Sequence, residues 1–221
     1  MRDSQFATNE ELEAMAKELT GRAGLEWSAL INHCSEVVVF GSHAAGFQTP
    51  LSDLDLLVVG QPVMVLTLPH MSRIDLVFRT EEQVHSADWL KSELAGHIAV
   101  YGRWLYGADD WRAKALEGLG ENSAAAEAKR RRIGRLTHSL HTHWDRLTPD
   151  FRIRNLITLR REEQRLRLLE SGVAVPPTRL LDIWAERDSL HLAHVDAMSG
   201  SGRCHSGTPA IARVDDRGVH I

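Results

Sequence analysis

Two short apolar segments that flank a Gly-Ser turn constrain the fold of this sequence more than any other feature. Residues 37–40 (Val-Val-Val-Phe) are apolar throughout, and residues 54–59 (Leu-Asp-Leu-Leu-Val-Val) are apolar except for Asp55. Such runs are typical of strands that are buried on both faces of a sheet. The sequence therefore predicts an α/β fold in which residues 41–53 connect two central strands.

Two carboxylates mark the predicted start of the second strand. Asp53 and Asp55 are two residues apart, so their side chains are expected on the same face of the sheet. Ionised carboxylates beside apolar residues are costly unless they are paired or bind a metal. Carboxylate oxygens suit Mg²⁺, and two such ions can activate an attacking oxygen and stabilise a leaving phosphate. Asp53 and Asp55 are therefore predicted metal ligands and catalytic residues.

A third acid lies in residues 74–78, which the apolar pattern predicts to be another strand. Ile74 and Leu76 point to one face of this strand, so Asp75 points to the other. A neighbouring strand, parallel or antiparallel, would bring Asp75 beside the first two acids. There it is expected either to complete the coordination sphere of a metal or to take the proton from an attacking hydroxyl.

The turn after the first strand is a candidate phosphate site. Gly41 and Ser42 follow that strand directly and precede Asp53 by about a dozen residues. A strand followed by Gly-Ser and a helix start places backbone N–H groups where a phosphate can bind. Gly41 allows a tight turn and a close ligand approach, and the Ser42 hydroxyl can donate to a phosphate oxygen.

These residues together resemble the signature of a known superfamily. The run Gly-Ser-His-Ala-Ala-Gly at 41–46, followed by Ser-Asp-Leu-Asp-Leu at 52–56, is similar to the motif of the DNA polymerase β-like nucleotidyltransferases. The resemblance implies a small mixed sheet flanked by helices, two Mg²⁺ ions and a bound NTP, with ATP expected. It also implies that an acceptor hydroxyl attacks the α-phosphorus and that pyrophosphate leaves. Gly41 and Ser42 would bind the nucleotide, and Asp75 matches the third acid.

The rest of the chain differs in character from this region. Residues 1–112 are expected to form the nucleotidyltransferase domain, and residues 113–198 a helical domain with amphipathic helices near 122–146, 151–171 and 178–197. In the second of these helices a predicted apolar stripe contains Ile153, Leu156, Leu159, Leu166 and Leu169. Residues 199–221 are rich in Gly and Ser and are predicted to be a flexible tail.

Charge and composition place limits on location and partners. Residues 1–120 contain 9 Lys and Arg against 17 Asp and Glu, whereas residues 121–221 contain 17 against 13. An acidic half suits metal ions or a cationic acceptor, and a basic half suits phosphates or nucleic acid. No apolar run is long enough to span a bilayer, no secretory signal is evident, and Cys34 and Cys204 give no disulfide framework. We therefore expect a cytoplasmic protein with no membrane partner.

The acceptor is the open part of the prediction. We expect a small-molecule hydroxyl, as in the aminoglycoside nucleotidyltransferases, which also pair this domain with a helical one. The alternatives are a protein or tRNA acceptor, as in toxin–antitoxin nucleotidyltransferases, or a non-catalytic nucleotide-binding module. For a polycationic acceptor, Asp88 and Glu93 are candidate contacts. The basic run at 129–132 is interpreted either as a solvated helix face paired with Glu162, Glu163 and Glu170 or as a contact for phosphates or RNA.

Overall fold

A mixed four-stranded sheet forms the centre of the N-terminal part. The computed structural model describes residues 7–61, 73–121 and 123–184, and within these ranges the strand order is β3-β2-β1-β4. The strands are β1 (Cys34–Phe40), β2 (Leu54–Gly60), β3 (Ile74–Arg79) and β4 (Arg103–Tyr106). β1 pairs antiparallel with β2 and β4, whereas β2 pairs parallel with β3. The predicted strands at 37–40, 54–59 and 74–78 are therefore confirmed.

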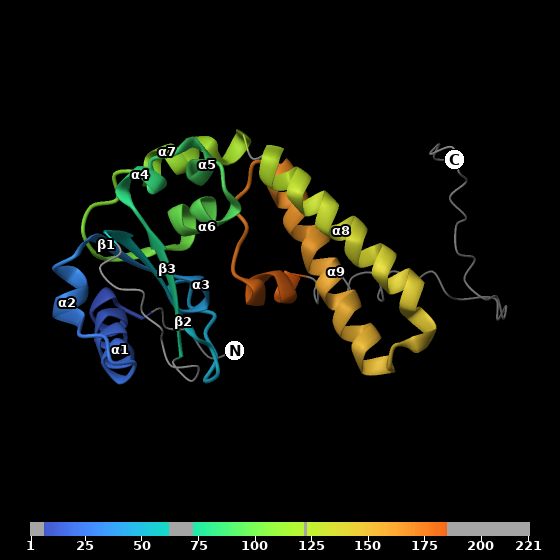
Figure 1. Cartoon of the computed structure of the whole chain (residues 1–221), viewed down its shortest axis with the longest axis horizontal. Coiled ribbons are helices and arrows are strands. Elements are labelled where there is room, and N and C mark those ends of the chain that lie inside the picture. Colours follow the sequence, from blue (N-terminus) through green and yellow to red (C-terminus); the bar gives the residue numbers. More distant parts are fainter. Residues whose placement is uncertain (1–6, 62–72, 122, 185–221) are drawn as a thin grey trace, which may run out of the picture. The chain divides into compact units, whose positions relative to one another are not determined.

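Alternation along the strands produces two apolar cores, one on each face of the sheet. Val37 and Val39 pack with α1 (Asn9–Arg22) and α2 (Trp27–Ile31), whereas Val38 packs on the opposite face with α5 (Ala87–Leu90), α6 (Glu93–Tyr101) and α7 (Arg112–Glu117). Figure 1 shows α1 and α2 apart from the group of α4 (Glu81–Val84), α5, α6 and α7. Burial on both faces explains why these strands have continuous apolar sequences.

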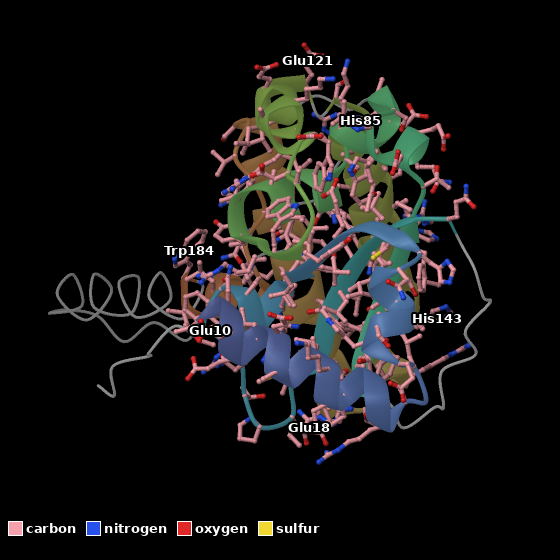
Figure 2. The ribbon with its side chains drawn as sticks, turned by 90° about the vertical axis from the view of Figure 1, so that its left-hand side faces the viewer. Glu10, Glu18, His85, Glu121, His143 and Trp184 are labelled. Carbon is pink, nitrogen blue, oxygen red and sulfur yellow. The ribbon has the colours of Figure 1, made fainter. Side chains whose placement is uncertain are left out.

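The helix α1 illustrates how the sequence sets these layers. Thr8 and Glu11 form a reciprocal capping box that satisfies two N-terminal backbone donors. Leu12 and Ala16 are fully buried against the sheet, four residues apart on one helix face. Glu10 and Glu18 lie on the exposed side and are labelled in Figure 2.

Two long helices follow the sheet. These are α8 (Ser123–His143) and α9 (Pro149–Glu170), which run side by side in Figure 1. Thr148 caps α9 and Pro149 occupies its first turn, where a missing N–H is harmless. Residues 113–121 and 123–184 contain no strand, so the predicted α/β fold with a helical C-terminal region is confirmed. The domain boundaries remain a prediction, and the proposed tail at 199–221 lies outside the described residues.

The predicted apolar stripe of α9 is wrong at its N-terminal end. Leu169 is 4% exposed, but Ile153 and Leu156 are 56% and 46% exposed. The buried side of α9 includes Glu162, which lies nine residues after Ile153. Nine residues are about two and a half helical turns, so Ile153 points away from that side.

A buried lysine, rather than an apolar stripe, fastens the two long helices to α6. Lys129 Nζ lies 2.8 Å from Glu93 Oε2 on α6 and 3.0 Å from Glu162 Oε2 on α9. Lys129 and Glu162 are both buried. The interpretation of 129–132 as a solvated face is therefore wrong for Lys129. It holds for Arg130 and Arg131, which are exposed and paired with acids.

Candidate active site

The parallel pairing of β2 with β3 brings two of the predicted acids to the same level of the sheet. Asp55 is the register partner of Asp75, and the preceding Leu54 is the partner of Ile74. Both acids are on the face that carries Leu57, Val59 and Val77, on the side of α6. Asp53 precedes β2 rather than opening it. Asp53 and Asp75 are exposed, and Asp55 is half-buried.

Burial and the charges of the neighbouring acids both act on the Asp55 carboxyl. Burial, followed by the nearby charges of Asp75 and Asp53, raises the pKa of Asp55 to about 6. No described residue forms an ion pair or hydrogen bond with any of the three carboxylates. Within residues 7–61, 73–121 and 123–184, the Asp55 carboxylate therefore has no cationic partner.

The donor chemistry of the three acids fits a divalent cation. Carboxylate oxygens without a cationic partner are the ligands that Mg²⁺ prefers, and a cation would remove the repulsion that raises the pKa of Asp55. In the ranges described, no three His, Cys, Asp or Glu side chains are grouped as closely as a formed metal site. The backbone thus aligns Asp55 with Asp75 and keeps Asp53 nearby, without a closed coordination cage.

Gly41 is in direct contact with Asp55. Its φ of 68° is in the left-handed region, and a Cβ on this residue would lie 1.9 Å from Asp55 Oδ2. Only glycine combines that backbone conformation with such a close approach. Gly41 begins the short helix α3 (Gly41–Ala44), and its N–H donates to His97 Nε2 at 3.3 Å. The turn, the carboxylate and α6 are thereby packed together.

A cavity of about 620 Å³ opens beside this turn. Its volume falls in the range of small-molecule and cofactor sites. One wall comes from the sheet region and α6, and the other comes from α9 and the segment that follows it. The lining residues are Phe40, Gly41, Ser42, Phe47, Thr49, Ser52, Asp55, Glu93, Leu94, His97, Arg165, Val175, Pro176, Pro177, Thr178, Arg179 and Asp182. Of the predicted site residues, Gly41, Ser42 and Asp55 line it, whereas Asp53 and Asp75 do not.

The residues of the second wall were not among the predicted site residues. Arg165 Nη2 on α9 donates to Thr178 Oγ1 at 2.9 Å. Arg161 binds both carboxylate oxygens of Asp182, at 2.6 and 2.9 Å, and so attaches the helix at 178–184 to α9. Neither contact was recognisable, because the partners are 13 and 21 residues apart across a turn. The pair Pro176-Pro177 is a local sequence signal of a break between α9 and the helix that follows.

The acids proposed for a cationic acceptor differ in their surroundings. Asp88 is exposed on α5 and does not line the cavity. Glu93 does line it, but Lys129 lies 2.8 Å away and Arg165 lies 3.8 Å away. His43 is buried, with Nε2 at 3.3 Å from the Ser52 carbonyl oxygen, so it supports the loop rather than the cavity wall.

A comparison with protein families identifies the segment that contains these residues. Residues 26–101 match the family model described as the nucleotidyltransferase domain. Residues 26–101 are a nucleotidyltransferase domain. The match spans α2 through α6 and includes Gly41, Ser42 and all three acids. The resemblance to the DNA polymerase β-like nucleotidyltransferases is thus confirmed. The helical region, which supplies the second wall, lies outside the matched residues.

Three solved structures similar to this chain are described as toxin–antitoxin proteins. One is a toxin–antitoxin with AMP-PNP, with 19% identity, coverage of 57% of this chain and 98% of that chain, and a TM-score of 0.32. Two mutants of the toxin–antitoxin MntA-HpeT have identities of 18% and 20%, both with a TM-score of 0.32. They cover 57% of this chain, and 98% and 97% of their own chains. No curated protein sequence gave a significant match. No helix of the described residues is long and apolar enough to cross a membrane.

Proposed function

We propose that this chain is a metal-dependent enzyme that transfers NMP from an NTP, with ATP expected, to a hydroxyl group of a small-molecule acceptor. One observation carries the proposal. The Asp55 carboxylate lies against Gly41, at the wall of a cavity of about 620 Å³, with Asp75 as its neighbour in the sheet. An acid so placed, with no cationic partner among the residues that the structure describes, is suited to hold a metal at the phosphates of a nucleotide.

In this proposal the residues have separate roles. Asp53 and Asp55 would hold one or two Mg²⁺ ions, with Asp75 as the general base or, alternatively, a third ligand, and the metal would stabilise charge on the reacting phosphates. Gly41 and Ser42 would border the phosphates, since both line the cavity. The acceptor oxygen forms a bond to the α-phosphorus while the bond to the bridging oxygen of the β-phosphate breaks. Asp75 accepts the hydroxyl proton, and pyrophosphate leaves.

The two-walled cavity favours a small acceptor. A site bounded by Asp55 on one side and Thr178 on the other can surround a compact ligand. The competing proposal is a protein or RNA acceptor, and a separate surface supports it. Exposed apolar side chains of α9 (Phe151, Ile153, Leu156 and Ile157) lie among exposed arginines such as Arg154 and Arg160. Aromatic, aliphatic and arginine side chains together are typical of macromolecular interfaces.

A labelling experiment distinguishes these possibilities. The purified chain is incubated with α-labelled NTPs and Mg²⁺, together with a small-molecule hydroxyl library, protein extract or tRNA. We expect label on a small molecule, loss of transfer in EDTA, and loss in Asp53→Asn and Asp55→Asn. Asp88→Asn, exposed and outside the cavity, is the matched control and should retain transfer. Transfer that persists in EDTA would overturn the proposed mechanism, and label only on tRNA or protein would overturn the acceptor.

A further inference from the structure

His97 connects the two walls of the cavity. It is a buried residue of α6. Its Nε2 atom lies 3.3 Å from the backbone nitrogen of Gly41, and its Nδ1 atom lies 2.7 Å from the carbonyl oxygen of Val175. Gly41 begins the turn beside Asp55, whereas Val175 belongs to the segment after α9, 78 residues beyond His97. A single ring thus contacts both sides of the site.

The two hydrogen bonds define the protonation of the ring. A backbone N–H can only donate, so Nε2 must offer a lone pair to Gly41. A carbonyl oxygen can only accept, so Nδ1 must carry the proton that bonds to Val175. The ring is therefore neutral, with its hydrogen on Nδ1. Burial lowers the pKa of His97 and so favours this neutral form, and the nearby Arg165 acts in the same direction.

Aromatic neighbours hold the ring in this orientation. The Phe40 ring meets it edge to face, with centroids 6.2 Å apart, and the Tyr101 ring lies at 5.4 Å. Phe40 also immediately precedes the turn at Gly41. The ring is therefore fixed on the strand side as well as at both hydrogen-bonding nitrogens, and it leaves the Gly41 N–H little freedom to reorient.

We infer that His97 is a positioning residue for nucleotide binding, which holds the Gly41-Ser42 turn in place and connects it to the wall at Val175. This inference rests on the proposed function. His97 itself need not touch the nucleotide. Its acceptor nitrogen orients the turn whose next residue, Ser42, lines the cavity. Without that acceptor the turn is less preorganised, and part of the binding free energy is lost in ordering it.

Two substitutions of His97 each remove one of its two hydrogen bonds and retain the other. The amide of Asn reaches only as far as Nδ1 of histidine, so His97→Asn retains a donor to Val175 and loses the acceptor for Gly41. The longer Gln places its amide near Nε2, so His97→Gln retains the acceptor for Gly41 and loses the donor to Val175. Each variant loses one hydrogen bond and the same ring contacts with Phe40 and Tyr101. Their melting temperatures should therefore fall by similar amounts.

Nucleotide affinity is the deciding measurement. The Kd for ATP with Mg²⁺ is measured by calorimetry for the full chain and both variants. In His97→Asn we expect Kd to rise about three- to tenfold, as expected for one hydrogen bond. In His97→Gln we expect a change of less than about twofold. A purely structural role would instead weaken binding equally in the two variants, in proportion to their loss of stability.

Spectroscopy of the unsubstituted chain provides an independent test. Imidazole ¹⁵N shifts should identify His97 as neutral, with the hydrogen on Nδ1, in the absence of nucleotide. A ring with its hydrogen on Nε2, or equal Kd values in the two variants, would overturn the positioning role alone. Failure of the unsubstituted chain to bind any of the four NTPs would refute the proposed function, and with it the role of His97 in binding.

Discussion

Replacing Asp55 by Asn should make the metal-free protein more stable while it abolishes activity. Burial and two neighbouring acids raise the pKa of Asp55 from 3.8 to about 6. Ionising this carboxyl at neutral pH therefore opposes folding, and Asn removes that charge at nearly constant size. A shift of this size corresponds to about 3 kcal/mol for a fully buried group. Asp55 is half-buried, so solvent screening reduces our expectation to about 1–2 kcal/mol.

The sign of this effect depends on pH in a specific way. Between pH 3.8 and about 6 the folded protein binds a proton at Asp55 that the unfolded chain has released. The contribution of Asp55 to the free energy of unfolding is thus fully present below pH 3.8 and is lost as pH rises through about 6. The advantage of Asp55→Asn should accordingly be greatest at pH 7.5 and should shrink towards zero near pH 4.

Thermal unfolding in EDTA at pH 4.5, 6 and 7.5 measures this dependence. At pH 7.5 we expect a rise in melting temperature of about 3–6 °C, from the usual scaling for a chain of this size. Asp88→Asn, an exposed acid away from the site, should show no comparable rise. With Mg²⁺ and nucleotide the order should reverse, because only the unsubstituted chain gains stability from binding. An Asp55→Asn variant that is less stable in EDTA, or whose stability gain is independent of pH, would refute the reasoning.

Three further predictions follow from single contacts. Gly41→Ala should abolish NMP transfer and lower the free energy of unfolding by about 1–3 kcal/mol, because φ is 68° and the new Cβ would clash with Asp55 Oδ2. Activity assays and urea unfolding measure the two effects, and full activity in this variant would contradict the prediction. Lys129→Met should lower stability by about 3 kcal/mol, because Glu93 and Glu162 lose their shared cation. Arg131→Ala, at an exposed pair, should lower it by less than about 1 kcal/mol, and equal losses would contradict this account. Glu36→Leu should destabilise more than Glu36→Gln in thermal melts, because the Glu36 carboxylate accepts hydrogen bonds from Trp104 and Trp111 at 2.9 and 3.0 Å; the reverse order would argue against it.

Local patterns explain which parts of the fold were predictable. The strands at 37–40 and 54–59 were recognisable because burial on both faces leaves a continuous apolar run. The proximity of Asp55 and Asp75 was predictable, since both are polar positions within apolar strands. Sequence alone did not specify their register, which depends on the pairing of β2 with β3.

Long-range contacts explain what was missed. In the sequence, His97 is a polar residue in an apolar helix with no evident partner. Its contact with Val175, 78 residues away, is visible only in the structure. Lys129 was grouped with its arginine neighbours because a charge run on a helix usually faces solvent. Its burial depends on Glu93 from α6, a contact between distant parts of the chain. The apolar side chains of α9 were assigned to one stripe, but Leu166 and Leu169 pack in an apolar cluster, whereas Ile153 and Leu156 are exposed.

The fate of the labelled phosphates tests the central claim most directly. The chain is given Mg²⁺, acceptor and either α-labelled or γ-labelled ATP, and the products are separated. Nucleotidyl transfer predicts label from the α-position on the acceptor and label from the γ-position in pyrophosphate, with both lost in Asp55→Asn. Label from the γ-position on the acceptor, or release of inorganic phosphate without transfer, would contradict it.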